Sequence, residues 1–200
     1  MTVTSTSTST AAVSVAERVV YSDGLRWERV LLHIATTAAV QLVDLTDHIA
    51  TAVAGAGLRS GWVAVTCRHT SCGVMVNEYE SGLCRDVRTL CRELVECHPS
   101  RLWEHDNLEV RTENLVDGER PNAHSHLLTM LFSQPVLHVT VEAGRLDLGR
   151  WQRVLLAEFD GPRPDPDVPP GREPVHPIRQ VVLDICSFTG HRIPTNAAGA

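Results

Sequence analysis

The sequence predicts an α+β fold, in which one domain combines a mixed, mostly antiparallel sheet with two or three helices. Segments with helical spacing and segments with strand-like alternation follow one another without the regular strand-helix-strand order of a parallel sheet. The chain has 200 residues, of which 43% are hydrophobic and 4% aromatic, so it can bury a core built from Val, Leu, Ala and Ile. We expect this single domain to span residues 13–190.

The N-terminal part is predicted to form a hairpin followed by a helix. Residues 1–12 are a Ser/Thr-rich run that cannot bury enough apolar surface to fold, so we expect a disordered tail. Residues 13–21 and 26–34 alternate like strands on either side of an Asp-Gly turn. The spacing over residues 43–56 indicates a helix that ends at a pair of glycines.

The middle of the chain alternates again between strands and helices. Strands are predicted over residues 62–68 and 74–77, on either side of a His-Thr-Ser corner. Apolar residues then recur at helical spacing over residues 81–96, which predicts an amphipathic helix. The polar segment 101–119 is predicted to be a loop long enough to be functional, and a helix is expected to begin at Pro121.

Strands predominate in the C-terminal part of the chain, and we predict them over residues 136–141, 145–148, 151–159 and 179–186. Seven of the eleven prolines fall within residues 161–177. We interpret this segment as a loop insertion that interrupts a β-hairpin formed by the last two strands. Residues 191–200 are expected to fray.

Composition excludes several classes of function. The formal charge of −6, without a basic sector, argues against nucleic-acid binding. No apolar run reaches the roughly 18–20 residues of a membrane span, and the N-terminus lacks the form of a secretory signal, so we expect a cytoplasmic protein without a membrane partner. The six cysteines are then expected to be reduced and structural, and none forms a Cys-x-x-Cys motif.

Imidazoles and carboxylates occur at the ends of predicted elements in separated segments. His69 follows one predicted strand, and Glu78 follows the next. His105 and Asp106 lie in the long polar loop, and His126 lies near the start of the following helix. Folding could bring these groups to one cleft, which is the pattern of an active site for a small-molecule substrate.

The segment that contains His126 has two possible geometries. On a helix, Asn122 and His126 are four residues apart and share a face, whereas His124 points elsewhere. On a strand, His124 and His126 would instead face the same way and could chelate a metal.

The predicted site supports two chemistries. His69, His105 and His126, with Glu78 or Asp106 as a carboxylate, would make an open site for zinc or a similar divalent metal. The same groups could work without a metal, with a histidine as general acid or base and a glutamate that orients it. Their spacing does not separate these alternatives, because the residues come from distant segments.

Six short motifs in order resemble those of the YjbQ family, whose members are identified as secondary thiamine-phosphate synthases. They are His69-Thr70-Ser71, Asn77-Glu78, Glu104-His105-Asp106, Asn122 with His126, Gly144-Arg145-Leu146 and Leu148-Gly149-Arg150-Trp151-Gln152. The resemblance covers about residues 19–188. It implies an α+β fold, a homotrimer, and a site in which His126 matches the family's histidine, so we expect the catalytic residues to be His126, Glu78 and Asn122.

The resemblance also implies a reaction that joins a hydroxymethylpyrimidine diphosphate to a thiazole phosphate and releases pyrophosphate. Such chemistry needs a cation for the leaving diphosphate. All 18 basic residues are arginines, and Arg68, Arg120 and Arg150 lie beside the motifs. The alternatives are a metal-dependent hydrolase and a non-catalytic homotrimer that binds a metal or a small molecule. Gln134 stands where family members usually have a glycine, which affects substrate binding if that glycine admits a ligand.

Overall fold

The computed structural model describes residues 12–22, 25–96, 103–115, 119, 121–161 and 178–188. The expected N-terminal tail up to residue 11, the Asp-Gly turn, residues 162–177 of the Pro-rich insertion and the last ten residues lie outside this part of the chain.

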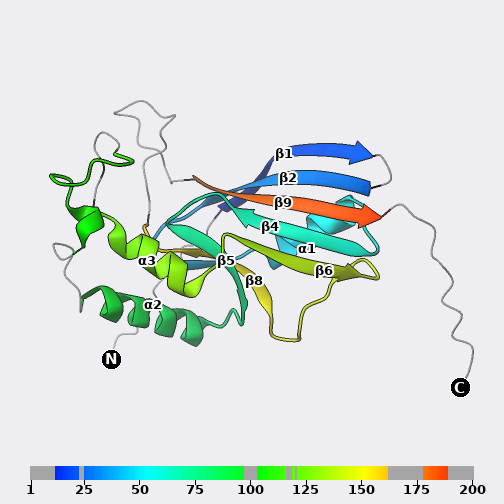
Figure 1. Cartoon of the computed structure of the whole chain (residues 1–200). Coiled ribbons are helices and arrows are strands. Elements are labelled where there is room, and N and C mark those ends of the chain that lie inside the picture. Colours follow the sequence, from blue (N-terminus) through cyan, green and yellow to red (C-terminus); the bar gives the residue numbers. More distant parts are fainter. Residues whose placement is uncertain are drawn as a thin grey trace, which may run out of the picture.

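The larger of two sheets has six strands in the order β1-β2-β9-β4-β6-β7, and every neighbouring pair is antiparallel (Figure 1). Its strands are β1 (Ala12–Ser22), β2 (Leu25–Ala35), β9 (Ile178–Phe188), β4 (Gly61–Cys67), β6 (Val136–Glu142) and β7 (Arg145–Leu146). The β1-β2 hairpin is the one that the alternation of the sequence predicts. Strand β9 occupies the centre, between two strands that lie far earlier in the chain.

A second sheet has three antiparallel strands in the order β3-β8-β5, formed by β3 (Gln41–Asp44), β8 (Arg153–Glu158) and β5 (Cys72–Asn77). The predicted hairpin between the last two long strands is therefore wrong, because β8 and β9 belong to different sheets. Strand β8 is buried from Val154 to Glu158. It is covered by strands on both edges and by side chains on both faces, so the next strand along the chain is not its partner.

Three α-helices complete the fold: α1 (Thr46–Gly55), α2 (Ser81–Glu96) and α3 (Ala123–Phe132). Helix α2 has the predicted bounds. The helix predicted over residues 43–56 begins later, because its first residues belong to β3, and Asp44 accepts a hydrogen bond from the Thr46 N–H at 2.9 Å where α1 begins. The 3-10 turn η2 (Glu104–Asp106) lies in the segment predicted to be a loop. None of the described helices is long and apolar enough to cross a membrane.

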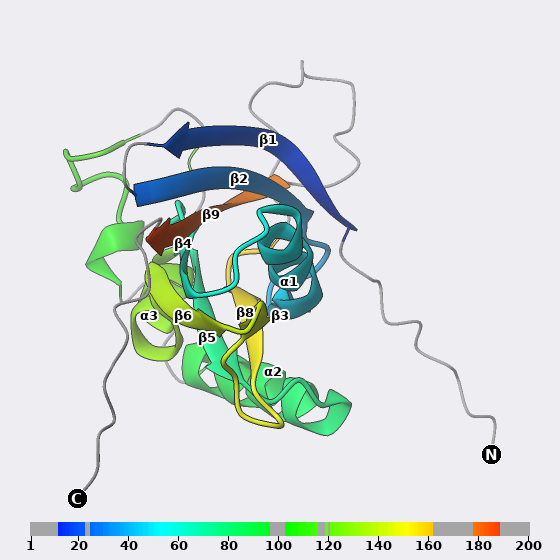
Figure 2. The same ribbon diagram turned by 90° about the vertical axis from the view of Figure 1, so that its right-hand side faces the viewer.

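The elements form layers, with the small sheet in the middle (Figure 2). One core fills the space between the two sheets and beneath α1, and it includes Leu32, Ile49, Val65 and Leu156. A second, smaller core lies on the other side of the small sheet, where Cys91 of α2 and Leu128 of α3 pack against Phe159. The small sheet is therefore buried on both faces, and α3 lies close to β5.

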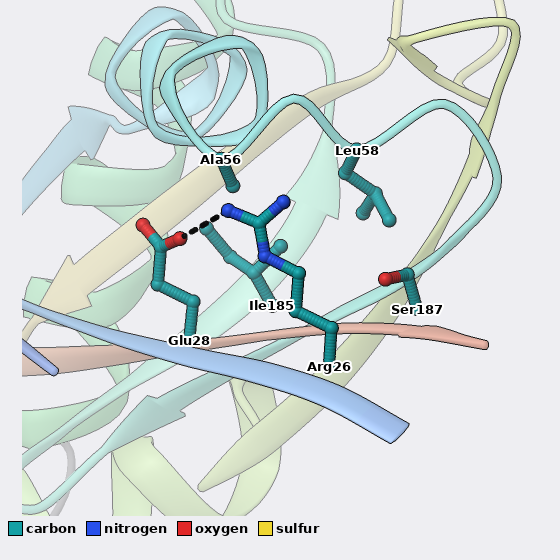
Figure 3. Close-up of a pocket in the computed structure, with 6 residues that line it drawn as sticks. All are labelled: Arg26, Glu28, Ala56, Leu58, Ile185 and Ser187. Atoms are coloured by element: carbon teal, nitrogen blue, oxygen red, sulfur yellow. Dashed lines mark hydrogen bonds and ion pairs between the residues drawn. The ribbon is translucent and has the colours of Figure 1, made fainter. Parts of the chain in front are cut away.

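Glu28 is buried beneath the end of α1, beside the partly exposed side chain of Arg26 (Figure 3). Glu28 of β2 is 1% exposed, and its Oε2 lies 3.5 Å from Nη2 of Arg26. Ala56, Leu58 and Ile185 line the surrounding hollow, which has no room for a bound molecule. The pair has a structural role there.

Candidate functional site

Two of the predicted histidines meet at the start of α3. His105 lies in η2 and His126 in the first turns of α3, and their ring centroids are 4.9 Å apart with the rings at 79° to each other. The edge of one imidazole thus faces the other ring. These residues are 21 positions apart in the sequence, and the structure brings them into contact at one place on the surface.

The backbone of the His-Thr-Ser corner fixes the orientation of His126. Its Nδ1 lies 3.0 Å from the carbonyl oxygen of Thr70. Because a carbonyl can only accept, Nδ1 carries the proton, and in the neutral ring the lone pair is on Nε2. A histidine whose Nδ1–H is held by a backbone carbonyl presents Nε2 for proton transfer or for metal binding.

An arginine that the sequence analysis did not select orients His105. Nη1 of Arg111 lies 3.0 Å from both ring nitrogens of His105, and Nη2 of Arg111 lies 2.5 Å from Oε2 of Glu119. The Arg111 side chain is 13% exposed. A guanidinium can only donate, so the ring nitrogen that it contacts accepts. The sequence gave no signal for this arrangement, because neither Arg111 nor Glu119 belongs to a recognisable motif.

Asp106, which lies outside helix α3, caps the N-terminus of that helix. One carboxylate oxygen, Oδ1, accepts hydrogen bonds from the N–H groups of Asn122 and Ala123, at 2.8 and 2.9 Å. These are free donors at the helix N-terminus, where a negative charge is also favoured. Because Oδ1 is engaged in this way, only Oδ2 of Asp106 could take the predicted role of metal ligand.

Two buried acceptor atoms remain near the histidine pair. Oδ2 of Asp106 and Oδ1 of Asn122 are buried, and neither has a hydrogen-bond partner among the described residues. Asn122 as a whole is 4% exposed. Both atoms are closed to solvent in this structure, so neither is open to a bound molecule as it stands.

His69 holds the corner against β9. Its Nε2 accepts a hydrogen bond from the Gln180 N–H at 2.9 Å, so this lone pair is already engaged. The structure brings together two of the three predicted metal ligands, His105 and His126. Among the residues that the structure describes, no three His, Cys, Asp or Glu side chains are grouped as they would be to hold a metal ion.

Glu78 lies at the far end of β5 from the histidine pair. The strand runs from Cys72, beside the corner, to Asn77, and then leads into α2 (Figure 1). At about 3.3 Å per residue, this places Glu78 roughly 20 Å from the start of the strand. Arg150 lies near the same end, because Arg153 pairs with Asn77, and its guanidinium stacks over Trp151 at 4.6 Å.

The remaining predicted residues are Arg68, Arg120 and His124, and they do not lie together. Arg68 is exposed at the His-Thr-Ser corner, and Arg120 lies outside the described residues. His124 faces away from His126, as the helical spacing predicts. It lines a separate cavity of about 360 Å³ between α2 and α3, together with Arg88, Arg92 and the apolar side chain of Leu128.

Comparison with known proteins places this architecture among close relatives. Residues 30–187 match the model of a family described as UPF0047 protein YjbQ-like. A UPF0047 protein of Archaeoglobus fulgidus is 36% identical over 132 residues, which cover 66% of this chain and 91% of that protein. The UPF0047 protein YugU of Bacillus subtilis is 35% identical, over 66% of this chain and 89% of its own length.

Two solved structures share the fold. A YbjQ-like protein of unknown function from Sulfolobus solfataricus superimposes with a TM-score of 0.63 at 28% identity, over 82% of this chain and 99% of that one. A hypothetical protein from Aeropyrum pernix has a TM-score of 0.60 at 31% identity, over 78% and 96% of the two chains.

Proposed function

The chain belongs to the YjbQ (UPF0047) family, and we propose that it is an enzyme acting on a small phosphorylated metabolite, with His105 and His126 as its acid-base centre. The contact between the two imidazoles carries this proposal. His126 is held at Nδ1 by the Thr70 carbonyl, so its Nε2 can give and take a proton.

The specific reaction that we propose follows from the family resemblance and is a thiamine-phosphate synthase-like transfer. A C–N bond forms between the pyrimidine methylene and the thiazole nitrogen while the C–O bond to the diphosphate breaks. His126, as an imidazolium protonated on both nitrogens, would donate its Nε2 proton to the leaving pyrophosphate and be left as the neutral ring with its proton on Nδ1. Arg68, exposed at the corner, would bind its charge.

We propose further that the active protein is a homotrimer and that neighbouring subunits share each site. The positions of Glu78 and Arg150 support this, because they lie at the far end of β5, roughly 20 Å along the strand from the corner that contacts His126. A neighbouring subunit would supply these residues. Mixing two inactive variants tests this directly, since trimers that combine His126→Ala and Glu78→Gln subunits should contain some sites with both native residues and regain activity.

The residues fit a zinc-like ion only in part. His105 and His126 offer two imidazoles, whereas catalytic zinc sites usually have three protein ligands. A third ligand, such as Glu78, would have to come from a neighbouring subunit. A bound ion would supply an activated water, which is the chemistry of the alternative function, a metal-dependent hydrolase.

The decisive experiment compares wild type with His126→Ala and with His124→Ala as a matched control. Both replacements remove an imidazole from α3, but His124 lies on the opposite side, in the separate cavity. We expect wild type and His124→Ala to form thiamine phosphate and His126→Ala to lose at least 100-fold in rate, a typical contribution of acid-base catalysis. Metal content and oligomeric state are measured on the same samples.

Each alternative gives a different result. If His126→Ala keeps wild-type activity, the assignment of the acid-base centre is wrong. Stoichiometric ligand or metal binding by wild type, without turnover across a panel of phosphorylated substrates, would identify a non-catalytic binding protein. Loss of the oligomer in His126→Ala alone would mean that the histidines join subunits.

A further inference from the structure

Two cysteines lie in contact at the base of the His-Thr-Ser corner. Cys67 is the last residue of β4 and Cys72 the first residue of β5, and their Sγ atoms are 3.4 Å apart. Both residues are buried, with exposed fractions of 4% and 0%. Among the cysteines that the structure describes, this is the pair whose sulfur atoms touch.

We propose that Cys67 and Cys72 form a redox-active dithiol, which a small hydroperoxide converts to a disulfide. A disulfide needs its sulfur atoms about 2.05 Å apart, so the two must approach by only about 1.4 Å. The four residues between them form a corner with no regular structure, where the backbone can adjust. The proposal depends on this contact alone and does not require the proposed enzyme activity.

The surroundings of the two thiols give them different roles. The contact between the two sulfur atoms lowers the pKa of Cys67 despite its burial, and the Arg179 guanidinium lowers it further. The same contact and burial raise the pKa of Cys72. Because Cys67 is the less buried of the two, we assign it the attack on the peroxide and Cys72 the resolution of the intermediate.

The oxidation balances with hydroperoxide as the only added reactant. The Cys67 thiolate attacks one peroxide oxygen, so that an S–O bond forms, the O–O bond breaks, and the departing hydroxide takes a proton to leave as water. The sulfur of Cys72 then attacks the Cys67 sulfenic acid. The S–S bond forms, the S–O bond breaks, and the hydroxide leaves as water with the Cys72 proton. The two thiols lose two electrons, which reduce the peroxide.

The disulfide would change the geometry of the His-Thr-Ser corner, which makes one hydrogen bond through His69 and another to His126. Between the cysteines lie His69, which accepts from the Gln180 N–H, and Thr70, whose carbonyl accepts from His126. Closing the S–S bond shortens the base of this corner. Oxidation is thus expected to displace the carbonyl that fixes the orientation of His126.

Peptide mapping of the full-length protein tests the proposal. Reduced protein is treated with hydrogen peroxide, remaining thiols are blocked, and the chain is digested with trypsin and chymotrypsin. Cleavage after Arg68 separates Cys67 from Cys72, and cleavage after Tyr79 separates Cys72 from Cys84. We expect a peptide pair joined through Cys67 and Cys72, and a protein lighter than its reduced form by two hydrogen atoms.

Serine variants provide the controls. Cys67→Ser and Cys72→Ser should each abolish the crosslink, whereas Cys84→Ser should keep it, because Cys84 lies apart on α2. Cys67→Ser should also protect Cys72 from oxidation to sulfenic acid, while Cys72→Ser should accumulate sulfenic acid at Cys67. Peroxide-treated wild type that stays folded and shows no crosslink, or one between other cysteines, would overturn the proposal whether or not the variants fold.

Discussion

Replacing Arg179 with methionine should destabilise the protein more than almost any other single charge removal. Arg179 of β9 donates two hydrogen bonds to Glu158 of β8, from Nε at 2.5 Å and from Nη2 at 2.8 Å, so it links the two sheets. The side chains of Arg179 and Glu158 are 5% and 0% exposed. Burial by itself would lower the pKa of Arg179, but its hydrogen bonds to Glu158 and the charge of that carboxylate raise it above its usual value.

The magnitude follows from what Glu158 would retain. Without Arg179 it keeps the Thr36 hydroxyl at 3.1 Å and the N–H groups of Asp160 and Gly161, but it loses its paired charge. Removing one partner of a buried ion pair costs about 3–5 kcal/mol of unfolding free energy. For a chain of this size, that corresponds to a fall in Tm of roughly 6–20 °C.

Urea denaturation followed by tryptophan fluorescence measures the loss at fixed protein concentration. Arg153→Met is the matched control, because Arg153 also contacts two carboxylate groups, Asp44 at 2.7 Å and Asp47 at 2.9 Å, but its side chain is 35% exposed. It should lose only about 0–1 kcal/mol. Adding Glu158→Gln to Arg179→Met should recover stability by removing the unpaired charge. Equal losses in the two arginine variants, or no recovery in the double variant, would refute the reasoning.

Two further substitutions test local features of the fold. Gly61→Ala should lower the free energy of unfolding by at least about 1–3 kcal/mol in the same denaturation assay, because its Cβ would lie 2.1 Å from the Cys186 carbonyl oxygen. Gly57→Ala should lower it by about 1 kcal/mol, because Gly57 lies in open space but at φ +65°. Glu80→Gln should lower Tm at pH 7, because hydrogen bonds from the N–H groups of Gly82 and Leu83 lower the pKa of the Glu80 carboxyl in the folded state. That stabilisation is present above the unfolded pKa of about 4.3 and is lost as the pH falls through the lower folded value. The difference in Tm between wild type and variant should therefore close in acid. A constant difference from pH 7 to pH 3 would contradict this explanation.

Local sequence patterns predicted most elements of the fold but not their partners. The spacing of apolar residues was enough to give the bounds of α2, since an amphipathic helix depends on its own periodicity. Strand β3 was missed because its four residues precede α1 without a turn signal. The pairing of β8 with β3 and β5 depends on contacts across the whole chain, which no local pattern encodes.

The candidate site was predictable in its residue types but not in its geometry. Motif order selected His105 and His126, and the structure places them in contact. The same reasoning grouped them with His69 and Glu78. In the structure, His69 accepts a hydrogen bond from the Gln180 backbone, and Glu78 lies at the far end of β5. Sequence also gave no sign of Arg111, whose role depends on how an irregular segment folds over η2.

The central position of β9 has a consequence for how the chain is made. Strands β2 and β4 are complete within the first 67 residues, yet each is hydrogen-bonded to a strand that ends at Phe188. During synthesis at about 5–20 residues per second, their inner edges would wait several seconds for a partner. Exposed strand edges can pair with other chains, so the nascent protein passes through an aggregation-prone interval that ends when its last strand is inserted. The order of the strands therefore leads us to expect that this protein depends on chaperones during translation.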